Sequence, residues 1–362
     1  MMGRTLATGN NVAGHTLALA GEANRNARGC CAGAYPITPQ TEMIEFLSGL
    51  NCNKGRVVLV ESEHSAMGVC IGAALAGART FTASSSNGLA YMTENIFAAG
   101  YYRLPTVMIA VNRTLGPPWN IWVDQGDSLM MRDAAWLQFY CDSHQDLADT
   151  ILLAFRVAED KRVMLPVIVA MDGFVTSHTQ MVVDLFAQEQ VDAFLPPCVI
   201  SHRLKHDHPA TFGGMTFASE TEHHRYAIQH SMEQVFPVLN EARDEFENIF
   251  GRRPAGALET FETEDAETIL IACNTMARTV VIERRARGEK IGMIRTKLFR
   301  PFPREELLAA IGKAGRVAVL DRNHSPGSGG IFWLEIAATL KDRSYVLLQD
   351  YLVGLGGGDV TP

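Results

Sequence analysis

Residues 30–41 read CCAGAYPITPQT, a short run of small and apolar residues that passes directly into two closely spaced prolines. The run Cys30–Tyr35 predicts a buried strand. Pro36 and Pro39 have a fixed φ and push the residues before them out of the helical region, so we expect Thr38 in a rigid turn at the strand's carboxyl end. The alternative is an ordinary strand-to-helix turn in which Thr38 only caps the next helix.

The same alternation of short β-rich runs and longer helical patterns continues to about residue 180. It is typical of βαβ units, and it predicts a doubly wound parallel sheet with helices on both faces. Sites in such sheets lie in loops at the carboxyl ends of strands. Further strands are expected at Arg56–Val60, Thr80–Ser84, Thr106–Val111 and Pro166–Ala170, and helices at Glu63–Ala78 and Asp146–Asp160.

A second, smaller α/β domain is predicted for the C-terminal part of the chain. We divide the sequence into a first domain at 1–185, a linking segment at 186–257 and a second domain at 258–362. The linking segment contains six of the 11 histidines and one or two charged helices within Glu222–Phe250. In the second domain we expect strands at Thr268–Ala272, Lys290–Ile294, Arg316–Asp321 and Tyr345–Gln349, and helices at Thr275–Arg287, Arg304–Ala314 and Ile331–Leu340.

Composition narrows the class of protein. The chain has 362 residues, 47% of them hydrophobic and 20% charged, which is enough to bury a sizeable core. Its net charge of −8 argues against a nucleic-acid partner, and its apolar runs are shorter than the roughly 18 residues of a membrane helix. Seven cysteines without any C-x-x-C pair indicate reduced thiols in the cytoplasm, with no resident metal or iron–sulfur site.

An acidic cluster follows the apolar strand that ends at Val60. Glu61 and Glu63 lie beside His64, and a helix rich in Ala and Gly follows them. Such small residues permit the close approach of another backbone or a cofactor. Glu63 by itself is explained as a first-turn acid, because the helix dipole stabilises a carboxylate there. Two acids and a histidine within four residues are more than capping needs.

Arg113 directly follows the strand that ends at Val111. Its guanidinium suits bidentate binding of a small carboxylate, and the alternative is an ion pair with Asp124 or Asp127. Three strand ends of one sheet thus deliver a hydroxyl, a carboxylate and a guanidinium. A shared site is the better explanation of all three.

Taken together, these motifs resemble the α subunit of the 2-oxoacid:ferredoxin oxidoreductases, most closely the separate-subunit pyruvate type. This resemblance implies a thiamine-enzyme pyrimidine-type domain followed by a smaller transketolase C-terminal-like domain. The matching motifs span nearly the whole chain in order. They are AYPITPQT at 34–41, VESE at 60–63, NR at 112–113, NIW at 120–122, MDGF at 171–174, RPFP at 300–303, DRN at 321–323 and GLGG at 354–357.

The resemblance also implies a reaction, the oxidative decarboxylation of a 2-oxoacid by an enzyme of anaerobic metabolism. Electrons pass to iron–sulfur clusters, and the acyl group passes to coenzyme A. By motif position the catalytic carboxylate would hydrogen-bond the aminopyrimidine of thiamine diphosphate and support removal of its C2 proton. The implied site residues are Glu63 for catalysis and cofactor binding, Pro36 and Ile37 for the cofactor, and Thr38, Arg113, Trp119 and Trp122 for the substrate.

Partner chains are implied as well. The Gly-Asp-Gly motif that holds Mg2+ and the diphosphate in thiamine enzymes does not occur in the sequence. Diphosphate binding is therefore expected on a β subunit, and the clusters on further γ and δ subunits, so this chain is expected to be inactive alone. Ferredoxin, or NAD through a flavin subunit, would accept the electrons.

One motif departs from the pyruvate type, so the motifs do not decide which 2-oxoacid is the substrate. Residues 124–127 read DQGD, where close relatives read DHQD, in a loop that also contains Trp119 and Trp122. The tryptophan rings can enclose a methyl group, stack on an aryl group or anchor the loop on a partner. Thr38 is small and uncharged, which disfavours dicarboxylates. Pyruvate is preferred, a bulkier or aromatic 2-oxoacid such as phenylglyoxylate is the alternative, and a non-catalytic scaffold subunit is the alternative of another class.

Overall fold

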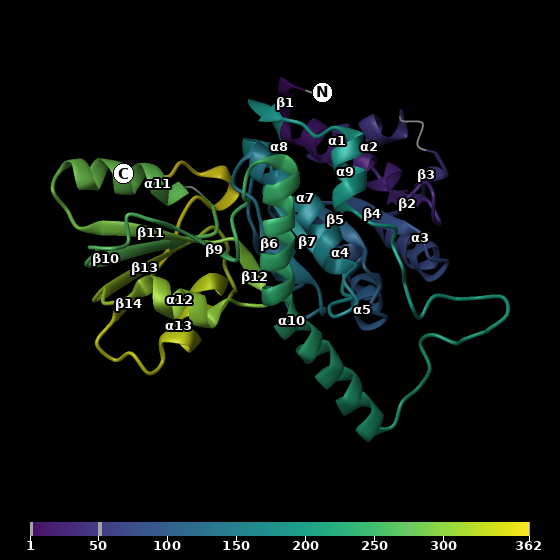
Figure 1. The fold of residues 1–362 in the computed structure, drawn as a ribbon. Helices are drawn as coiled ribbons and strands as arrows, with labels where there is room; N and C mark the ends of the chain where they lie inside the picture. The colour runs from purple at the N-terminus through teal and green to yellow at the C-terminus, as the bar shows by residue number, and fades with distance from the viewer. Residues whose placement is uncertain (1–2, 50–52, 275, 362) are drawn as a thin grey trace.

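The computed structural model describes residues 3–49, 53–274 and 276–361, which form two large sheets and a two-stranded one, with helices around them (Figure 1). Cys52, one of the seven cysteines, and Thr275, the expected start of a helix, lie outside these residues. Among the described residues, no helix combines the length and the apolar character needed to cross a membrane.

The larger sheet contains every strand predicted for the first domain. Its strand order within the described residues is β12-β6-β7-β5-β4-β2-β3, and all neighbours pair in parallel except β12 with β6. β3 lies on one side of β2 and β4 on the other. The order in which successive strands are added to the sheet therefore reverses at β2. The strands are β2 (Cys30–Ala34), β3 (Gly55–Leu59), β4 (Arg79–Ser84), β5 (Val107–Asn112), β6 (Leu137–Tyr140), β7 (Val167–Asp172) and β12 (Leu298–Arg300).

Helices cover both faces of this sheet, which confirms the predicted α/β class. The alternation of side chains along β5 shows the two faces: Val107, Ile109 and Val111 join one core, while Met108 and Ala110 join the other. Core residues of α1, α2 and α7 lie on the first face, and those of α3, α4 and α5 on the second. These helices are α1 (Gly9–Glu22), α2 (Thr41–Ser48), α3 (Glu63–Leu75), α4 (Asn87–Tyr91), α5 (Thr93–Tyr101) and α7 (His144–Ala158).

The smaller sheet belongs to the C-terminal part, and its strands run in the order β14-β13-β10-β11-β9. Its pairs are parallel except β9 with β11. The strands are β9 (Leu258–Phe261), β10 (Thr268–Ala272), β11 (Ile291–Thr296), β13 (Arg316–Asp321) and β14 (Leu347–Leu352), with α11 (Met276–Ala286), α12 (Arg304–Ile311), α13 (Ile331–Leu340) and the 3-10 turn η1 (Leu355–Gly357).

Several short strands were absent from the predictions. β6, β9 and β12 have three or four residues, too few to show a hydrophobic period. β1 (Arg4–Thr8) and β8 (Gln180–Asp184) form a separate antiparallel pair. Two further short helices are α6 (Gly126–Leu129) and α8 (Val175–His178).

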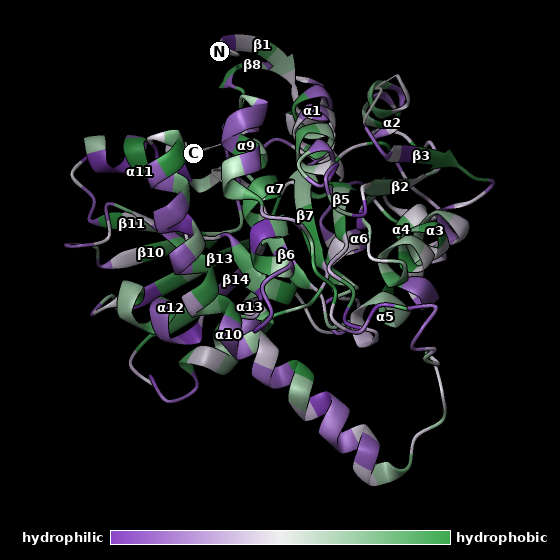
Figure 2. Cartoon of the chain, turned by 45° about the vertical axis from the view of Figure 1, so that its right-hand side comes forward, coloured by the Kyte–Doolittle hydropathy of each residue, from purple (hydrophilic) through white to green (hydrophobic). Residues whose placement is uncertain are grey.

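The segment between the two sheets contains α9 (Gln188–Phe194) and α10 (Ala218–Phe250). Of the one or two charged helices expected there, the structure has a single long one, α10. The C-terminal half of α10 packs on α7 through Val235, Leu239 and Phe246. Its N-terminal end projects from the body and is largely hydrophilic (Figure 2).

The two parts share one apolar core. It contains Met108 and Ile168 of the larger sheet together with Ile271 and Val319 of the smaller one. The ring of Phe332 from α13 lies 5.6 Å from that of Tyr140 and 4.6 Å from that of Phe299, measured between centroids. β12 therefore joins the large sheet at a place where aromatic side chains from both parts meet.

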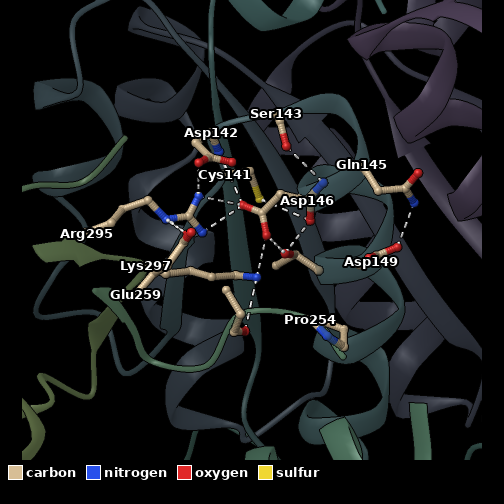
Figure 3. A network of polar contacts seen from close by, with 12 residues as sticks. Cys141, Asp142, Ser143, Gln145, Asp146, Asp149, Pro254, Glu259, Arg295 and Lys297 are labelled. Carbon is tan, nitrogen blue, oxygen red and sulfur yellow. Dashed lines mark hydrogen bonds and ion pairs between the residues drawn. The ribbon is translucent and has the colours of Figure 1, made fainter. Parts of the chain in front are cut away.

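A buried ion cluster also joins β11 to the start of α7 (Figure 3). The Asp146 carboxylate lies 2.6 Å from Lys297 Nζ and 3.0 Å from Arg295 Nη2, and both cations are almost fully buried. Arg295 also contacts Asp142 at 2.6 Å and Glu259 at 3.3 Å. Burial opposes ionisation of Asp146, but Lys297 and Arg295 outweigh it and hold its pKa well below the usual range.

We predict that Asp146→Asn lowers the free energy of unfolding by about 3–5 kcal/mol, because it leaves two buried cations short of their counter-charge. Urea unfolding at pH 7 measures this change. Since the pKa of Asp146 is lowered in the folded state, its contribution is present above the ordinary aspartate pKa and is lost as the pH falls through the lowered value. The gap between variant and wild type should therefore narrow in acid.

The matched control is Asp207→Asn, at an exposed position whose only ion-pair contact among the described residues is with His208. Its effect should stay within about 0.5 kcal/mol. Equal effects of the two substitutions would contradict a stabilising role for the cluster.

Candidate active site

The turn after β2 is held from two sides. Gln40 Nε2 donates to the Tyr35 carbonyl at 2.8 Å, and Asn10 Nδ2 donates to the Pro39 carbonyl at 2.9 Å. Within this turn, Pro36 and Thr38 are both exposed. Ile37 between them is half-buried. The turn therefore presents Thr38 outward on a fixed backbone.

Arg113 reaches this turn from the end of β5. Its side chain is buried, and Nη1 donates to the Thr38 carbonyl at 2.5 Å. The Trp119 ring lies 4.8 Å from its guanidinium carbon. Among the described residues, no ion pair joins this guanidinium to Asp124 or Asp127, so the alternative raised from the sequence is not observed. Burial lowers the pKa of Arg113, whereas the charges of Asp127 and Glu63 raise it.

Glu63 is the first residue of α3, behind the N-cap Ser62. Its side chain is buried, yet no hydrogen bond to its carboxylate occurs within the described residues. Gly88 of α4 lies against it, since a Cβ at residue 88 would be 2.5 Å from both Glu63 Oε1 and Ser84 Oγ. The hydroxyls of Ser84 and Ser85 are fully buried and also have no partner within the described chain. Polar groups with unused hydrogen-bonding capacity therefore gather at this point.

The two tryptophans of the loop after β5 have different surroundings. Trp119 stacks over Arg113, while the Trp122 ring lies 4.9 Å from that of Phe174, which follows β7. Both tryptophans remain about half exposed. Thr114 N donates to the Trp122 carbonyl at 3.1 Å, which closes the loop on itself. The structure thus brings Trp119, Thr38 and Arg113 into contact and leaves Trp122 at the margin. Glu63 lies near enough for its charge to raise the pKa of Arg113.

The second part of the chain supports this loop from outside. Gly357 N donates to the Val123 carbonyl at 3.2 Å, and Gln125 N donates to the Arg322 carbonyl at 3.0 Å. A Cβ at residue 357 would lie 2.6 Å from Trp122 Cβ. The glycine-rich turn of the GLGG motif is therefore a contact surface for the loop beside Arg113.

Asp172, at the end of β7, connects the same two parts through polar contacts. Its carboxylate is buried and accepts hydrogen bonds from Gln125 Nε2 at 3.2 Å, Asn274 Nδ2 at 3.0 Å and Arg322 Nη1 at 3.1 Å. Because Asn274 and Arg322 follow the ends of β10 and β13, the carboxyl ends of both sheets meet here.

Comparison with known proteins identifies the family of this chain. Residues 23–244 match the family described as "Pyruvate flavodoxin/ferredoxin oxidoreductase, thiamine diP-bdg", and residues 266–362 match "Pyruvate:ferredoxin oxidoreductase core domain II". The chain belongs to the pyruvate:ferredoxin oxidoreductase family. The resemblance expected from the motifs is thereby confirmed, and the chain is a subunit of the thiamine-diphosphate 2-oxoacid:ferredoxin oxidoreductase family.

Curated relatives in this family include both pyruvate and branched-chain types. The chain is 43% identical to pyruvate synthase subunit PorA of Methanothermobacter thermautotrophicus, over 91% of this chain and 86% of that one. It is 40% identical to ketoisovalerate oxidoreductase subunit VorA of Pyrococcus horikoshii, over 93% and 87%.

A solved structure of the 2-oxoglutarate:ferredoxin oxidoreductase from Magnetococcus marinus has the same fold, with a TM-score of 0.74 and 18% identity. The match covers 99% of this chain and 63% of that one. That structure holds 2-oxoglutarate, coenzyme A and succinyl-CoA.

Three residues at this family site have positions that the motifs did not reveal. Gly88 lies in an ordinary helical stretch, and nothing in its sequence context marks its contact with Glu63. Asp127 was considered as an ion-pair partner of Arg113 and as part of the DQGD motif, and neither indicated its four N–H donors. Asp172 is part of a matching motif, and an acid at the end of an apolar strand was the signal that could have identified it.

We predict that Gly357→Ala loosens the loop at 114–125. The new Cβ would collide with Trp122, and residue 357 has a φ of +83° that an L side chain adopts at a cost of about 1–2 kcal/mol. Limited proteolysis should cut the loop faster than in wild type.

Gly288→Ala is the matched control, because Gly288 has a φ of +86° and no atom within 4 Å of its Cβ position. It should show similar backbone strain without faster cleavage of the loop. Equal cleavage of both variants would mean that the GLGG turn does not support the loop.

Proposed function

We propose that this chain is the α subunit of a coenzyme A-dependent 2-oxoacid:ferredoxin oxidoreductase and provides one half of its active site. The observation that supports this most directly is the convergence of the Thr38 turn, the Arg113 guanidinium and the Glu63 carboxylate, which accepts no hydrogen bond from the described part of the chain. They meet at the carboxyl ends of parallel strands, beside the point where the strand order reverses, which is where ligands bind in this fold class.

The residues around Glu63 suit the aminopyrimidine part of thiamine diphosphate. The Glu63 carboxylate has acceptor capacity to spare, and Ser84 and Ser85 contribute buried hydroxyls without partners among the described residues. Pro36 and Ile37 would form the wall on the turn side. The cofactor supplies a carbon nucleophile and an electron sink when bound. Glu63 would hold a proton in a hydrogen bond to the cofactor ring and so orient it.

Arg113 is the residue best placed to bind the substrate carboxylate. One of its Nη groups is occupied by the Thr38 carbonyl, but Nε is buried without a partner among the described residues. The guanidinium fork therefore has donors left for a carboxylate. Thr38 would contact the same group, and Trp119, stacked on the guanidinium, would limit the space for the side chain of the 2-oxoacid. Trp122 would support the outer wall.

A partner subunit is needed to complete the site. We propose a β subunit that binds the diphosphate and Mg2+, with γ and δ subunits that complete the complex and hold the iron–sulfur clusters. Electrons would leave to ferredoxin, or to NAD through a flavin subunit. A cytoplasmic location is supported by Cys31, Cys70, Cys141, Cys198 and Cys273, which are free thiols.

We also propose the division of the chain at 1–185, 186–257 and 258–362. The separate sheets and the long helix α10 between them support it, although β12 extends the first sheet with residues from the third segment. Nucleic acid and membranes have no part in this proposal.

Pyruvate is the proposed substrate, in keeping with the pyruvate-type motifs. The relatives named for pyruvate and for ketoisovalerate have nearly equal identity to this chain, so a branched side chain is a close competitor. An aryl side chain, as in phenylglyoxylate, remains the alternative supported by the exposed face of Trp119.

We predict that Glu63→Gln leaves the complex assembled but slows exchange of the cofactor's C2 proton. The amide cannot hold the proton as the carboxylate does, and general acid–base groups typically contribute about 10²–10⁴-fold. Exchange into deuterated solvent, followed by NMR of the released cofactor, measures it.

Glu61→Gln is the control, because Glu61 is exposed and its side chain accepts a hydrogen bond from Ser65 Oγ in the first turn of α3. Its exchange rate should stay close to that of wild type. Turnover of the Glu63→Gln complex near the wild-type rate would favour a subunit whose role is assembly.

The substrate choice predicts that kcat/KM of the complete complex is highest for pyruvate among pyruvate, 2-oxoisovalerate and phenylglyoxylate. A more than tenfold preference for the aryl acid, about 1.4 kcal/mol of transition-state binding, would overturn this choice. Trp119→Ala should change the ranking if Trp119 forms the pocket wall, and should leave the ranking unchanged if the ring only anchors the loop.

A further inference from the structure

Asp127 is a fully buried carboxylate at the base of the loop that contains Trp119. Its two oxygens accept four N–H donors. Oδ1 accepts from Asn112 Nδ2 at 2.7 Å and from Ser128 N at 2.8 Å, while Oδ2 accepts from Ser86 N at 2.8 Å and Arg113 N at 3.0 Å. Each oxygen therefore accepts two hydrogen bonds. The donors come from three separate segments of the chain.

The charge of this carboxylate is balanced without a cation in contact. Among the described residues it forms no ion pair, and the Arg113 side chain extends away from it to the Thr38 carbonyl. Burial raises the pKa of Asp127, and the donors from Asn112, Ser86, Arg113 and Ser128 oppose it. With both effects included, the pKa is raised to about 7. Each of the four donors requires an acceptor oxygen, so the ionised carboxyl is the form that satisfies all of them.

The first consequence concerns Arg113. Asp127 accepts the N–H of this residue and is itself the end of the loop that begins at Thr114. The two ends of the loop are thereby joined at one carboxylate, and the backbone from which the guanidinium projects is fixed. Trp119, which covers that guanidinium, lies within the closed loop.

The second consequence concerns Glu63. Ser86 has φ 51° and ψ −126°, a conformation that a non-glycine residue adopts only when its surroundings hold it. Asp127 supplies one such contact through the Ser86 N–H. Gly88, two residues later, is the group packed against the Glu63 carboxylate. The position of this wall therefore depends on the turn that Asp127 holds.

We propose that Asp127 is a positioning residue that fixes Arg113 and the wall beside Glu63 at the same time, and so couples substrate binding to cofactor activation. This proposal rests on the proposed function of the site. It assigns Asp127 no contact with the substrate or the cofactor.

Asp127→Asn in the complete complex tests it. The amide has the same shape but replaces one acceptor oxygen with an NH2 group, so in either orientation two N–H donors lose their partner. We expect KM for pyruvate to rise at least tenfold and C2 proton exchange to slow by a similar factor. KM does not depend on the amount of folded enzyme, so lower stability alone would not move it.

Asp124→Asn is the matched control, because Asp124 lies in the same loop and accepts one backbone N–H, that of Gly126, at 2.8 Å. It should change neither KM nor exchange. Asn112→Ala removes one of the four donors and keeps the carboxylate, so it should raise KM at least threefold. If the Asp127→Asn complex does not assemble, this variant tests the positioning role in its place.

An Asp127→Asn or Asn112→Ala complex with wild-type KM and wild-type C2 exchange would overturn the positioning role. A wild-type complex that shows C2 exchange but oxidises no 2-oxoacid would instead contradict the proposed function. The two failures are therefore distinguished by the wild-type measurement.

Discussion

The hydrogen-bond register of the parallel strands β2, β3, β4, β5 and β7 determines where chemistry can occur in this chain. Parallel pairing brings every carboxyl end to the same edge of the sheet, and at that edge the chain leaves each strand through a loop. For this reason the Arg113 side chain reaches the backbone carbonyl of Thr38, 75 residues earlier in the chain. The strand order reverses beside β2, and in this fold class ligands bind at such a reversal.

Three buried carboxylates show how this protein stabilises negative charge inside its structure. Asp146 is neutralised by Lys297 and Arg295, which joins α7 to β11. Asp172 is bound by one guanidinium and two amides at the junction of the sheets. Asp127 has only N–H dipoles around it. The first two connect the two parts of the chain, while the third lies within the larger sheet's part and accepts the backbone N–H of Arg113.

The smaller C-terminal part does more than pack against the larger sheet. Its apolar core is continuous with one face of that sheet, and its glycine-rich turn contacts the loop beside Arg113 through Gly357 and Trp122. Movement of either part would therefore displace the loop that covers the guanidinium. A partner that docks on the C-terminal part could reach the site by this route without touching it.

The sequence by itself determined the α/β class, the longer strands and helices, and the identity of Thr38, Glu63 and Arg113 as candidates. Apolar periodicity and the position of polar residues just after strands are local signals, and the motif order supplied the family. It did not reveal β6, β12 or the single helix α10, because three or four residues are too few to show a period and packing decides whether a long charged segment is one helix.

Only the tertiary structure decided what surrounds those candidates. The contact of Gly88 with Glu63 and the hydrogen bond from Ser86 to Asp127 join residues 25 and 41 positions apart in sequence. Such contacts arise from the order in which strands pair, and neither periodicity nor local propensity records that order. The residue types that can perform the chemistry are thus readable from the sequence, while their distances and protonation depend on the folded chain.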